Sequence, residues 1–263
     1  MHINRRDTIV LLTAASALAL SGGAHAAEGD KHDVAKLMAA AANNGLTDHV
    51  LGDETAPVTV IEYASPTCPH CAAFSNNVLP AFVEQYVDTG KVRLIIRPFL
   101  RNVLDAVVFM LAEAGGPDNF FNILETFFKT QATWAVAEKP RDALLVVAKQ
   151  LGFTDETFDK ALTNQALYEG MEKMKTEALE VFDLEGTPTF YINGAQLTGD
   201  KTLEQMAAAV DPLIPAGFQP KPAAEASTTA PADTNAMAAE PVAPADTNNM
   251  MAAEPATPAA PAQ

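Results

Sequence analysis

The chain has 263 residues, of which 48% are hydrophobic, and it carries a formal net charge of −16. This acidic balance argues against nucleic acid as a partner, because phosphate binding requires a basic surface. It leaves proteins and small thiols as the expected partners. The sequence has 2 cysteines, which stand together as Cys68-Pro69-His70-Cys71. The sequence therefore has a single candidate thiol centre, and enough further length for one core of ordinary size.

The N-terminus reads as an export signal. The pair Arg5-Arg6 precedes an apolar stretch from Thr8 to Leu20, and Ala24-His25-Ala26 resembles a cleavage site. We therefore predict a signal peptide over residues 1–26, with either general secretion or the twin-arginine route open. The apolar stretch is shorter than the roughly 20 residues that span a bilayer. We expect delivery to the periplasm, where an oxidising environment lets a cysteine pair cycle as a disulfide.

The first part of the folded chain predicts a strand, a helix and a second strand. After a short helical segment at 27–52, with a helix from Asp33 to about Ala42, residues 58–64 are apolar on both faces and should form a central strand. A helix from Cys71 to about Val87 should bend at Pro80, and residues 91–99 predict the next strand. Residues 53–99 thus form a parallel unit.

Residues 100–183 show a helical pattern throughout, with breaks that indicate four or five helices. Apolar residues from Phe120 to Phe128 predict core packing. Strand character returns at 189–192, where the following Asn193-Gly194 predicts a two-residue hairpin, and a last helix spans Thr202 to about Val210. With 184–218 closing the domain, this order is that of a thioredoxin fold, an α/β fold with an inserted helical domain.

The last 45 or so residues, 219–263, are rich in Ala, Pro and Thr and predict a disordered tail. Methionines in this tail, together with the thiols, leave open a non-catalytic copper-binding protein, since thioethers are ligands for Cu(I). These are Met237, Met250 and Met251. A zinc site needs about four ligands, and no second Cys or His pair at similar spacing exists. Redox chemistry at the cysteines, without a metal, is the favoured interpretation.

Two segments carry a resemblance to a known family. Residues 62–71 read Glu-Tyr-Ala-Ser-Pro-Thr-Cys-Pro-His-Cys, and 186–190 read Gly-Thr-Pro-Thr-Phe. With the export signal, the chain resembles the DsbA-like thiol-disulfide oxidoreductases of the bacterial periplasm over about 48–215. The resemblance implies that Cys68 is the nucleophile and Cys71 the resolving thiol, with their disulfide as the only redox cofactor. A helix N-terminus at Cys68 would also favour its thiolate.

The resemblance assigns roles to neighbouring residues. His70 is expected to add hydrogen bonding or positive charge beside the Cys68 thiolate, with a solvent-exposed imidazole as the alternative. Pro188 matches the family's cis-proline, with a plain turn proline as the alternative. Together with Pro69, Thr187 and Pro188 are expected to contact an extended substrate segment.

Glu62 is an acid in the middle of a strand that should be covered on both faces. A buried carboxylate has a raised pKa and can relay a proton, here for Cys71. The alternative is a partly exposed edge residue that pairs with Arg93 or Arg97.

These observations predict an exported oxidase. It passes the Cys68–Cys71 disulfide to unfolded exported proteins through a mixed disulfide on Cys68, and a DsbB-type membrane partner reoxidises it. The alternative is an isomerase or reductase kept reduced by a DsbD-type partner, because Thr187 stands where the best-known oxidases carry valine. Such isomerases dimerise through a sizeable N-terminal domain, whereas residues 27–52 supply one short helix, so we expect a monomer.

Overall fold

The computed structural model describes residues 31–220. The predicted signal peptide at 1–26, the tail methionines and nearly all of the predicted tail at 219–263 lie outside the described residues. Within the described part, none of the helices has the length and apolar character needed to cross a bilayer.

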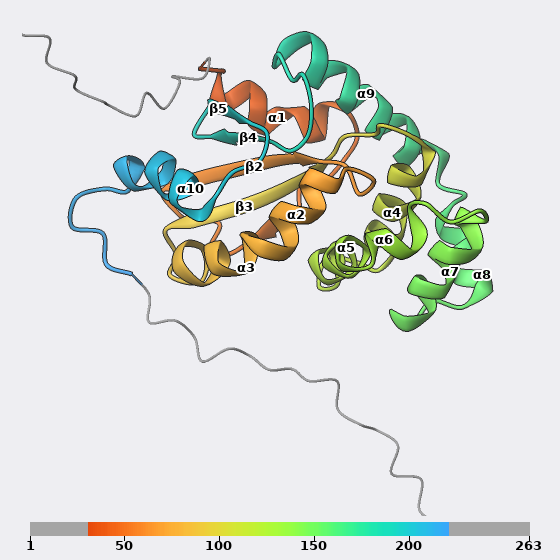
Figure 1. Ribbon diagram of the computed structural model, residues 1–263. Helices are drawn as coiled ribbons and strands as arrows, with labels where there is room; N and C mark the ends of the chain where they lie inside the picture. Colours follow the sequence, from red (N-terminus) through yellow and green to blue (C-terminus); the bar gives the residue numbers. More distant parts are fainter. Residues whose placement is uncertain (1–30, 221–263) are drawn as a thin grey trace, which may run out of the picture. The chain divides into compact units, whose positions relative to one another are not determined.

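A five-stranded sheet lies at the centre of the described chain (Figure 1). Its order is β1-β3-β2-β4-β5, with β2 parallel to β3 and antiparallel to β4. The strands are β1 (Val50–Leu51), β2 (Val58–Ala64), β3 (Val92–Pro98), β4 (Thr189–Ile192) and β5 (Ala195–Thr198). The prediction of a central strand at 58–64 is confirmed, and every residue of β2 is buried. The segment 27–52 was expected to be helical only, but it also contains β1, which is too short to produce a sequence pattern.

Helices occupy most of the remaining described chain. They are α1 (Val34–Asn43), α2 (Pro69–Asn77), α3 (Leu79–Phe82), the π-helix η1 (Val83–Val87), α4 (Val103–Ala114), α5 (Phe120–Lys129), α6 (Gln131–Trp134), α7 (Pro140–Gln150), α8 (Asp155–Ala161), α9 (Gln165–Val181), α10 (Leu203–Val210) and the 3₁₀ helix η2 (Asp211–Leu213).

The helical predictions hold with two corrections. The single helix expected over 71–87 is divided into α2, α3 and η1, with the break at Val78, just before Pro80. The inserted segment between β3 and β4 holds the six helices α4 to α9 instead of four or five, because the short α6 follows α5 after one residue. The predicted Asn-Gly hairpin is confirmed, since Asn193 and Gly194 both have positive φ, as a type I′ turn requires.

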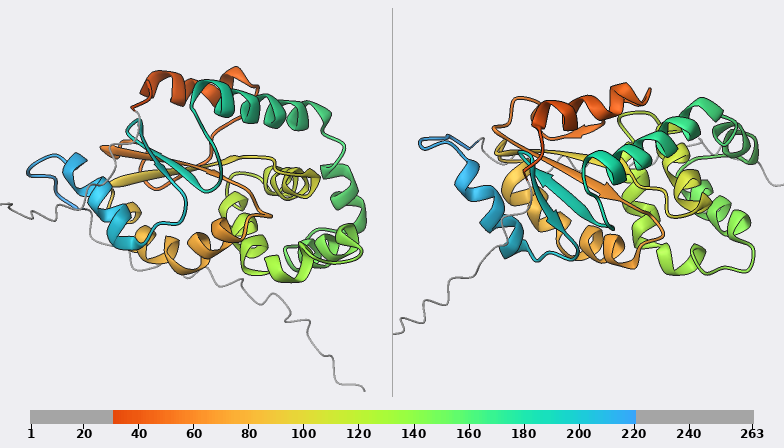
Figure 2. Two further views of the ribbon diagram at one scale, coloured as in Figure 1. Left: turned by 45° about the horizontal axis from the view of Figure 1, so that its top comes forward. Right: turned by 90° about the horizontal axis from the view of Figure 1, so that it is seen from above.

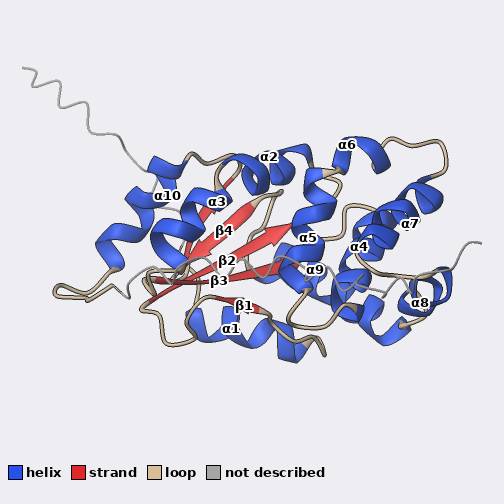
Figure 3. Ribbon diagram, turned by 90° about the horizontal axis from the view of Figure 1, so that it is seen from below, coloured by secondary structure: helices blue, strands red, loops and turns tan. Residues whose placement is uncertain are grey.

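Helices cover both faces of the sheet, which creates two apolar cores. Figures 1 and 2 show α1 and α9 on one face, and α2, α3 and α10 on the other. Successive side chains of β2 alternate between these cores: Ile61 and Tyr63 belong to the core of α1 and α9, whereas Val60 and Ala64 belong to the core of α2. The same alternation directs Glu62 toward α2. In Figure 3, helices α4 to α8 gather at the end of the sheet where β2 ends.

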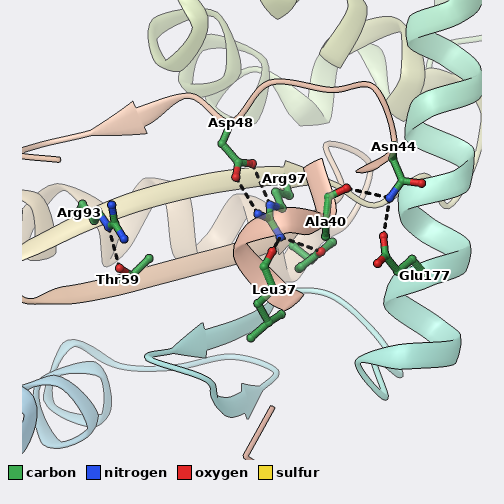
Figure 4. A network of polar contacts seen from close by, with 9 residues as sticks. Leu37, Ala40, Asn44, Asp48, Thr59, Arg93, Arg97 and Glu177 are labelled. Carbon is green, nitrogen blue, oxygen red and sulfur yellow. Dashed lines mark hydrogen bonds and ion pairs between the residues drawn. The ribbon is translucent and has the colours of Figure 1, made fainter. Parts of the chain in front are cut away.

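A buried arginine ties the segment before β1 to the sheet (Figure 4). Arg97 of β3 is 1% exposed and binds both carboxylate oxygens of Asp48, at 2.8 Å from Nε and 2.7 Å from Nη2. Its Nη1 donates to the carbonyl of Leu37 at 2.7 Å and to the hydroxyl of Tyr63 at 3.1 Å. The buried charge is therefore paired and hydrogen-bonded, which is the condition for tolerating it in a core.

Candidate active site

The cysteine motif lies where β2 ends and α2 begins. Cys68 is the N-cap of α2, with extended backbone angles φ −83° and ψ 120°, and Pro69 occupies the first helical turn, where a missing N–H has no cost. Cys71 follows one turn further into the helix. The two residues are 4% and 0% exposed, and both thiols are free. Cys68 therefore lies at a helix N-terminus, as expected from the sequence.

The surroundings of Cys68 stabilise its thiolate. The pKa of Cys68 is lowered to about 5, first by a hydrogen bond from the Cys71 thiol and then by interaction with the Thr187 side chain. The backbone N–H groups of Cys71 and His70 act in the same direction, whereas burial opposes it. These N–H groups are the free donors of the first helical turn, which have no carbonyl partner within the helix.

Cys71 is stabilised as a thiol. Burial is the largest cause that raises its pKa well above the ordinary value, followed by its hydrogen bond to Cys68 and the charge of Glu62. The backbone N–H of Ser65 lies 3.5 Å from Cys71 Sγ and opposes this only weakly. The pair therefore consists of one thiolate and one thiol near neutral pH.

Glu62 belongs to the buried strand β2 and is itself 2% exposed. Its burial, and secondly repulsion by Cys68, raises the pKa of its carboxyl to about 8. The alternative of an edge residue paired with an arginine is wrong: Arg93 donates to the Thr59 hydroxyl at 2.7 Å, and Arg97 binds Asp48 (Figure 4). A carboxyl that titrates close to neutral pH can both accept and return a proton.

The loop before β4 faces the motif. The peptide bond between Thr187 and Pro188 is cis, and the Cys68 thiol donates to the Thr187 carbonyl at 3.2 Å. Thr187 Oγ1 is buried and has no hydrogen-bond partner among the described residues. The Pro188 carbonyl accepts from the Gly199 N–H at 2.8 Å. The 117-residue separation of Cys71 and Pro188 in sequence (188 − 71) is thus closed in space by the pairing of β2 with β4.

His70 is exposed and its ring contacts an acid. Its Nδ1 lies 2.7 Å from Oδ2 of Asp200, in the loop between β5 and α10. The contribution of His70 to the Cys68 thiolate comes from its backbone N–H. The two sequence interpretations, a thiolate partner and a free exposed imidazole, both omitted Asp200.

Asp105 was not predicted from sequence, and it fixes the loop that leads to Cys68. This residue of α4 is 0% exposed, and its two carboxylate oxygens accept four hydrogen bonds. The donors are Ser65 Oγ at 2.8 Å, the Thr67 N–H at 2.7 Å, the Arg101 N–H at 2.8 Å and the Asn102 N–H at 3.1 Å. The spacing of Asn102 and Asp105 is a capping-box pattern that marks a helix start. That pattern carries no sign of the contact with residues 65–67.

Gln131 of α6 also reaches this loop. Its Nε2 donates to the carbonyl of Pro66 at 2.7 Å and to that of Cys68 at 2.9 Å. Two residues from the inserted helices therefore bind opposite polar groups of the loop: Asp105 accepts from its Thr67 N–H and Ser65 hydroxyl, and Gln131 donates to two of its carbonyls.

The arrangement is suited to thiol–disulfide exchange. It combines a stabilised thiolate, a second thiol one helical turn away and a buried carboxyl with a pKa of about 8. In residues 31–220, no group of three or more His, Cys, Asp or Glu side chains is placed to bind a metal ion.

Comparisons with known proteins agree with this arrangement. A family model described as thioredoxin matches residues 44–212. A Rickettsia bellii protein, provisionally named a protein-disulfide oxidoreductase, is 32% identical over 168 residues, which cover 64% of each chain. The match thus spans less than two thirds of that relative. The crystal structure of alpha-DsbA1 from Wolbachia pipientis superimposes with a TM-score of 0.60 at 27% identity, over 64% of this chain and 90% of that one. A protein-disulfide isomerase from Novosphingobium aromaticivorans gives a TM-score of 0.56 at 25% identity, over 63% and 97%.

Proposed function

The chain belongs to the thioredoxin family, and on that basis we propose that it is a thiol-disulfide oxidoreductase that donates the Cys68–Cys71 disulfide to protein substrates. The observation that carries the proposal is the contrast between the two thiols: the pKa of Cys68 is lowered to about 5, and that of Cys71 is raised. The redox group is the cysteine pair, and we propose no further cofactor.

The first step is attack on Cys68 by a substrate thiolate. A new disulfide forms between the substrate and Cys68, and the bond between Cys68 and Cys71 breaks. Cys71 leaves with the electron pair and takes up a proton, because its buried site favours the thiol. We propose Glu62 as the donor of that proton, because its pKa of about 8 leaves it protonated at neutral pH.

The second step releases the oxidised substrate. A second thiolate of the same substrate attacks the substrate sulfur of the mixed disulfide. Cys68 then leaves as a thiolate, which the helix N-terminus and the Cys71 thiol stabilise. The substrate has then lost two electrons as a disulfide, and the protein has gained them as one thiolate and one thiol. Of the two substrate protons, one replaces the proton that Glu62 gave to Cys71, and the other is released to solvent.

The pKa of Cys68 sets the proposed direction of electron flow. A thiolate with a pKa of about 5 favours the reduced protein at pH 7 by at most about 2.7 kcal/mol, or about 60 mV toward an oxidant. Solvent around the sulfur screens part of this effect, because the Cys68 thiol is not fully enclosed. The remainder still favours donation of a disulfide over its removal.

We place this activity in the periplasm, after export directed by residues 1–26. The proposed substrates are unfolded or partly folded exported proteins, and the proposed oxidant is a DsbB-type membrane protein. The protein would act as a monomer.

A second candidate keeps the fold and reverses the task. An isomerase or reductase, held reduced by a DsbD-type partner, is favoured by Thr187 before the cis-proline and by the structural likeness to a protein named as an isomerase. The two candidates differ in resting state: an oxidase rests as the disulfide, and an isomerase as the dithiol.

One experiment separates them. The purified protein is equilibrated with glutathione buffers, and the fraction of reduced Cys68 and Cys71 is measured by thiol trapping. An oxidase gives a reduction potential well above that of thioredoxin, about −270 mV. A value at or below that figure overturns the oxidase proposal. A Cys71→Ala variant whose Cys68 has first been converted to a mixed disulfide with glutathione should exchange that glutathione for a thiol of a reduced, unfolded substrate and accumulate the protein–substrate disulfide, and a Cys68→Ala variant treated in the same way should accumulate none.

A further inference from the structure

The side chain of Asp200 lies against the histidine of the cysteine motif. Its Oδ2 is 2.7 Å from His70 Nδ1, and the two side chains are 59% and 64% exposed. An exposed pair of this kind contributes little to stability, because water screens the charges and both side chains lose freedom. Its importance therefore depends on where the loop places the carboxylate.

The loop that carries Asp200 is fixed at both ends. Before it, the Gly199 N–H donates to the carbonyl of Pro188 at 2.8 Å, and Gly199 has a φ of 83°, which favours glycine. After it, Thr202 caps α10 and accepts from the N–H of Gln205. Asp200 thus lies between a contact to the cis-proline loop and a helix cap, a position that brings its carboxylate to the motif.

We propose that Asp200 is a positioning residue that moderates the reactivity of Cys68 by binding the imidazole of His70. The inference rests on the proposed function. A ring N–H of His70 directed at Cys68 would favour its thiolate. The Asp200 carboxylate instead holds the ring at Nδ1, toward the loop between β5 and α10, so that His70 contributes to the thiolate through its backbone N–H. The motif is therefore a milder oxidant than it would be if the His70 ring were free of Asp200.

The other charged groups near the motif do not replace Asp200. Glu62 is buried on β2, and only its ionised form, above a pKa of about 8, repels the thiolate. Lys201 directs its Nζ to the carbonyl of Asp200, at 3.1 Å, and to that of Thr198. Among the described residues, Asp200 is the carboxylate that contacts the His70 ring.

The test is an Asp200→Asn variant, which keeps the shape of the side chain and removes its charge. The pKa of Cys68 is measured from thiolate absorbance during acid titration of the reduced protein. We expect it to fall by roughly 0.2 to 0.7 units. The equilibrium with glutathione should shift about two- to fivefold toward the reduced protein. Asp200→Glu, which keeps the charge, should restore the parent values. Asp159→Asn, which removes an exposed ion pair with Arg141 near α8, is the matched control and should change neither.

A double variant separates action through His70 from direct repulsion of the thiolate. In a His70→Gln background, Asp200→Asn should shift the pKa of Cys68 by less than half as much as in the parent. An undiminished shift overturns the positioning role, and an unchanged or raised pKa in the single variant overturns the proposal as a whole. The titration needs no substrate. Failure of the parent protein to exchange with glutathione would therefore contradict the proposed function, but it would not change the conclusion drawn from the Cys68 pKa of the Asp200 variants.

Discussion

The backbone N–H of Thr67 donates to the carboxylate of Asp105 at 2.7 Å, so the first turn of α4 binds the residue just before Cys68. Asp105 belongs to the inserted helices, whereas Thr67 belongs to the β2–α2 connection. The insertion is therefore part of the active site, because the conformation of residues 65–67 depends on a side chain that it supplies.

We expect an Asp105→Asn variant to be destabilised by about 3 kcal/mol. The neutral amide replaces one carboxylate oxygen with a donor, which leaves buried N–H groups without an acceptor. Urea denaturation of the oxidised protein measures the change. Asp118→Asn, at an exposed site before α5, should stay within about 0.5 kcal/mol of the parent. Equal stabilities for the two variants would show that the four hydrogen bonds of Asp105 contribute nothing.

Replacing Gln131 should loosen the loop with a smaller loss of stability. In Gln131→Ala, the carbonyls of Pro66 and Cys68 lose a shared donor, at a cost of about 1 kcal/mol. The Cys68 N–H, which donates to the Ser65 carbonyl at 2.9 Å, should exchange its hydrogen faster. Hydrogen exchange followed by NMR reads this directly. Gln150→Ala at the end of α7 is the control, and an equally fast exchange in both variants would contradict the role of Gln131.

Glu62 should destabilise the folded protein at neutral pH. Its folded pKa of about 8 lies above the ordinary value of 4.5, so the cost is absent below pH 4.5 and grows as the pH rises to 8. We therefore expect Glu62→Gln to be more stable than the parent at pH 7, by on the order of 2 to 3 kcal/mol, and equal to it near pH 4. Exposed Glu84→Gln should show no such pH dependence. The same Glu62 variant should slow protonation of Cys71, measured as slower formation of mixed disulfide in stopped flow.

The reduced protein should gain stability relative to the disulfide form as the pH rises. Because the folded pKa of Cys68 is lowered to about 5, its contribution is fully present above the unfolded value of 9.0 and is lost as the pH falls through 5. Paired denaturation curves of both redox forms between pH 4 and 8 measure the difference. A difference that stayed constant over this range would mean that the Cys68 thiolate is not stabilised by the fold.

Thr187 should act on Cys68 through its hydroxyl. Interaction with this side chain lowers the pKa of Cys68, and its Oγ1 lacks another partner among the described residues. We expect Thr187→Val, which keeps the shape and removes the hydroxyl, to raise the pKa of Cys68, and Thr187→Ser to leave it close to the parent. Titration of the thiolate absorbance distinguishes the two variants, and an identical pKa in both would assign the effect to the backbone.

Much of the fold could be predicted from sequence because its signals are local. The apolar run at 58–64, the Asn193-Gly194 turn and the helix caps Asp33, Thr154 and Thr202 each predict an element from a few residues. The two-residue strand β1 and the four-residue α6 gave no comparable signal. Elements of that length are formed by their tertiary neighbours and have no periodicity of their own.

The residues of the site also fall into those with a local sequence signal and those without one. Cys68, Cys71 and Pro188 stand in recognisable motifs, whereas Asp105, Gln131 and Asp200 reach the site only through the chain's three-dimensional path. An acid at a helix start has an ordinary local explanation as a cap, so nothing in its neighbourhood points to residues 65–67. Contacts between distant segments need the structure.

The pairing of β2 with β4 also sets the order in which a growing chain acquires its chemistry. Synthesis produces both cysteines more than a hundred residues before Thr187 (187 − 71 = 116), so the thiols emerge while the central strand still has an open edge. Cys68 then lacks the carbonyl and hydroxyl that face it in the finished molecule. An incomplete chain therefore lacks the contribution of Thr187 to the Cys68 thiolate, and that contribution appears only once the last hairpin has joined the sheet.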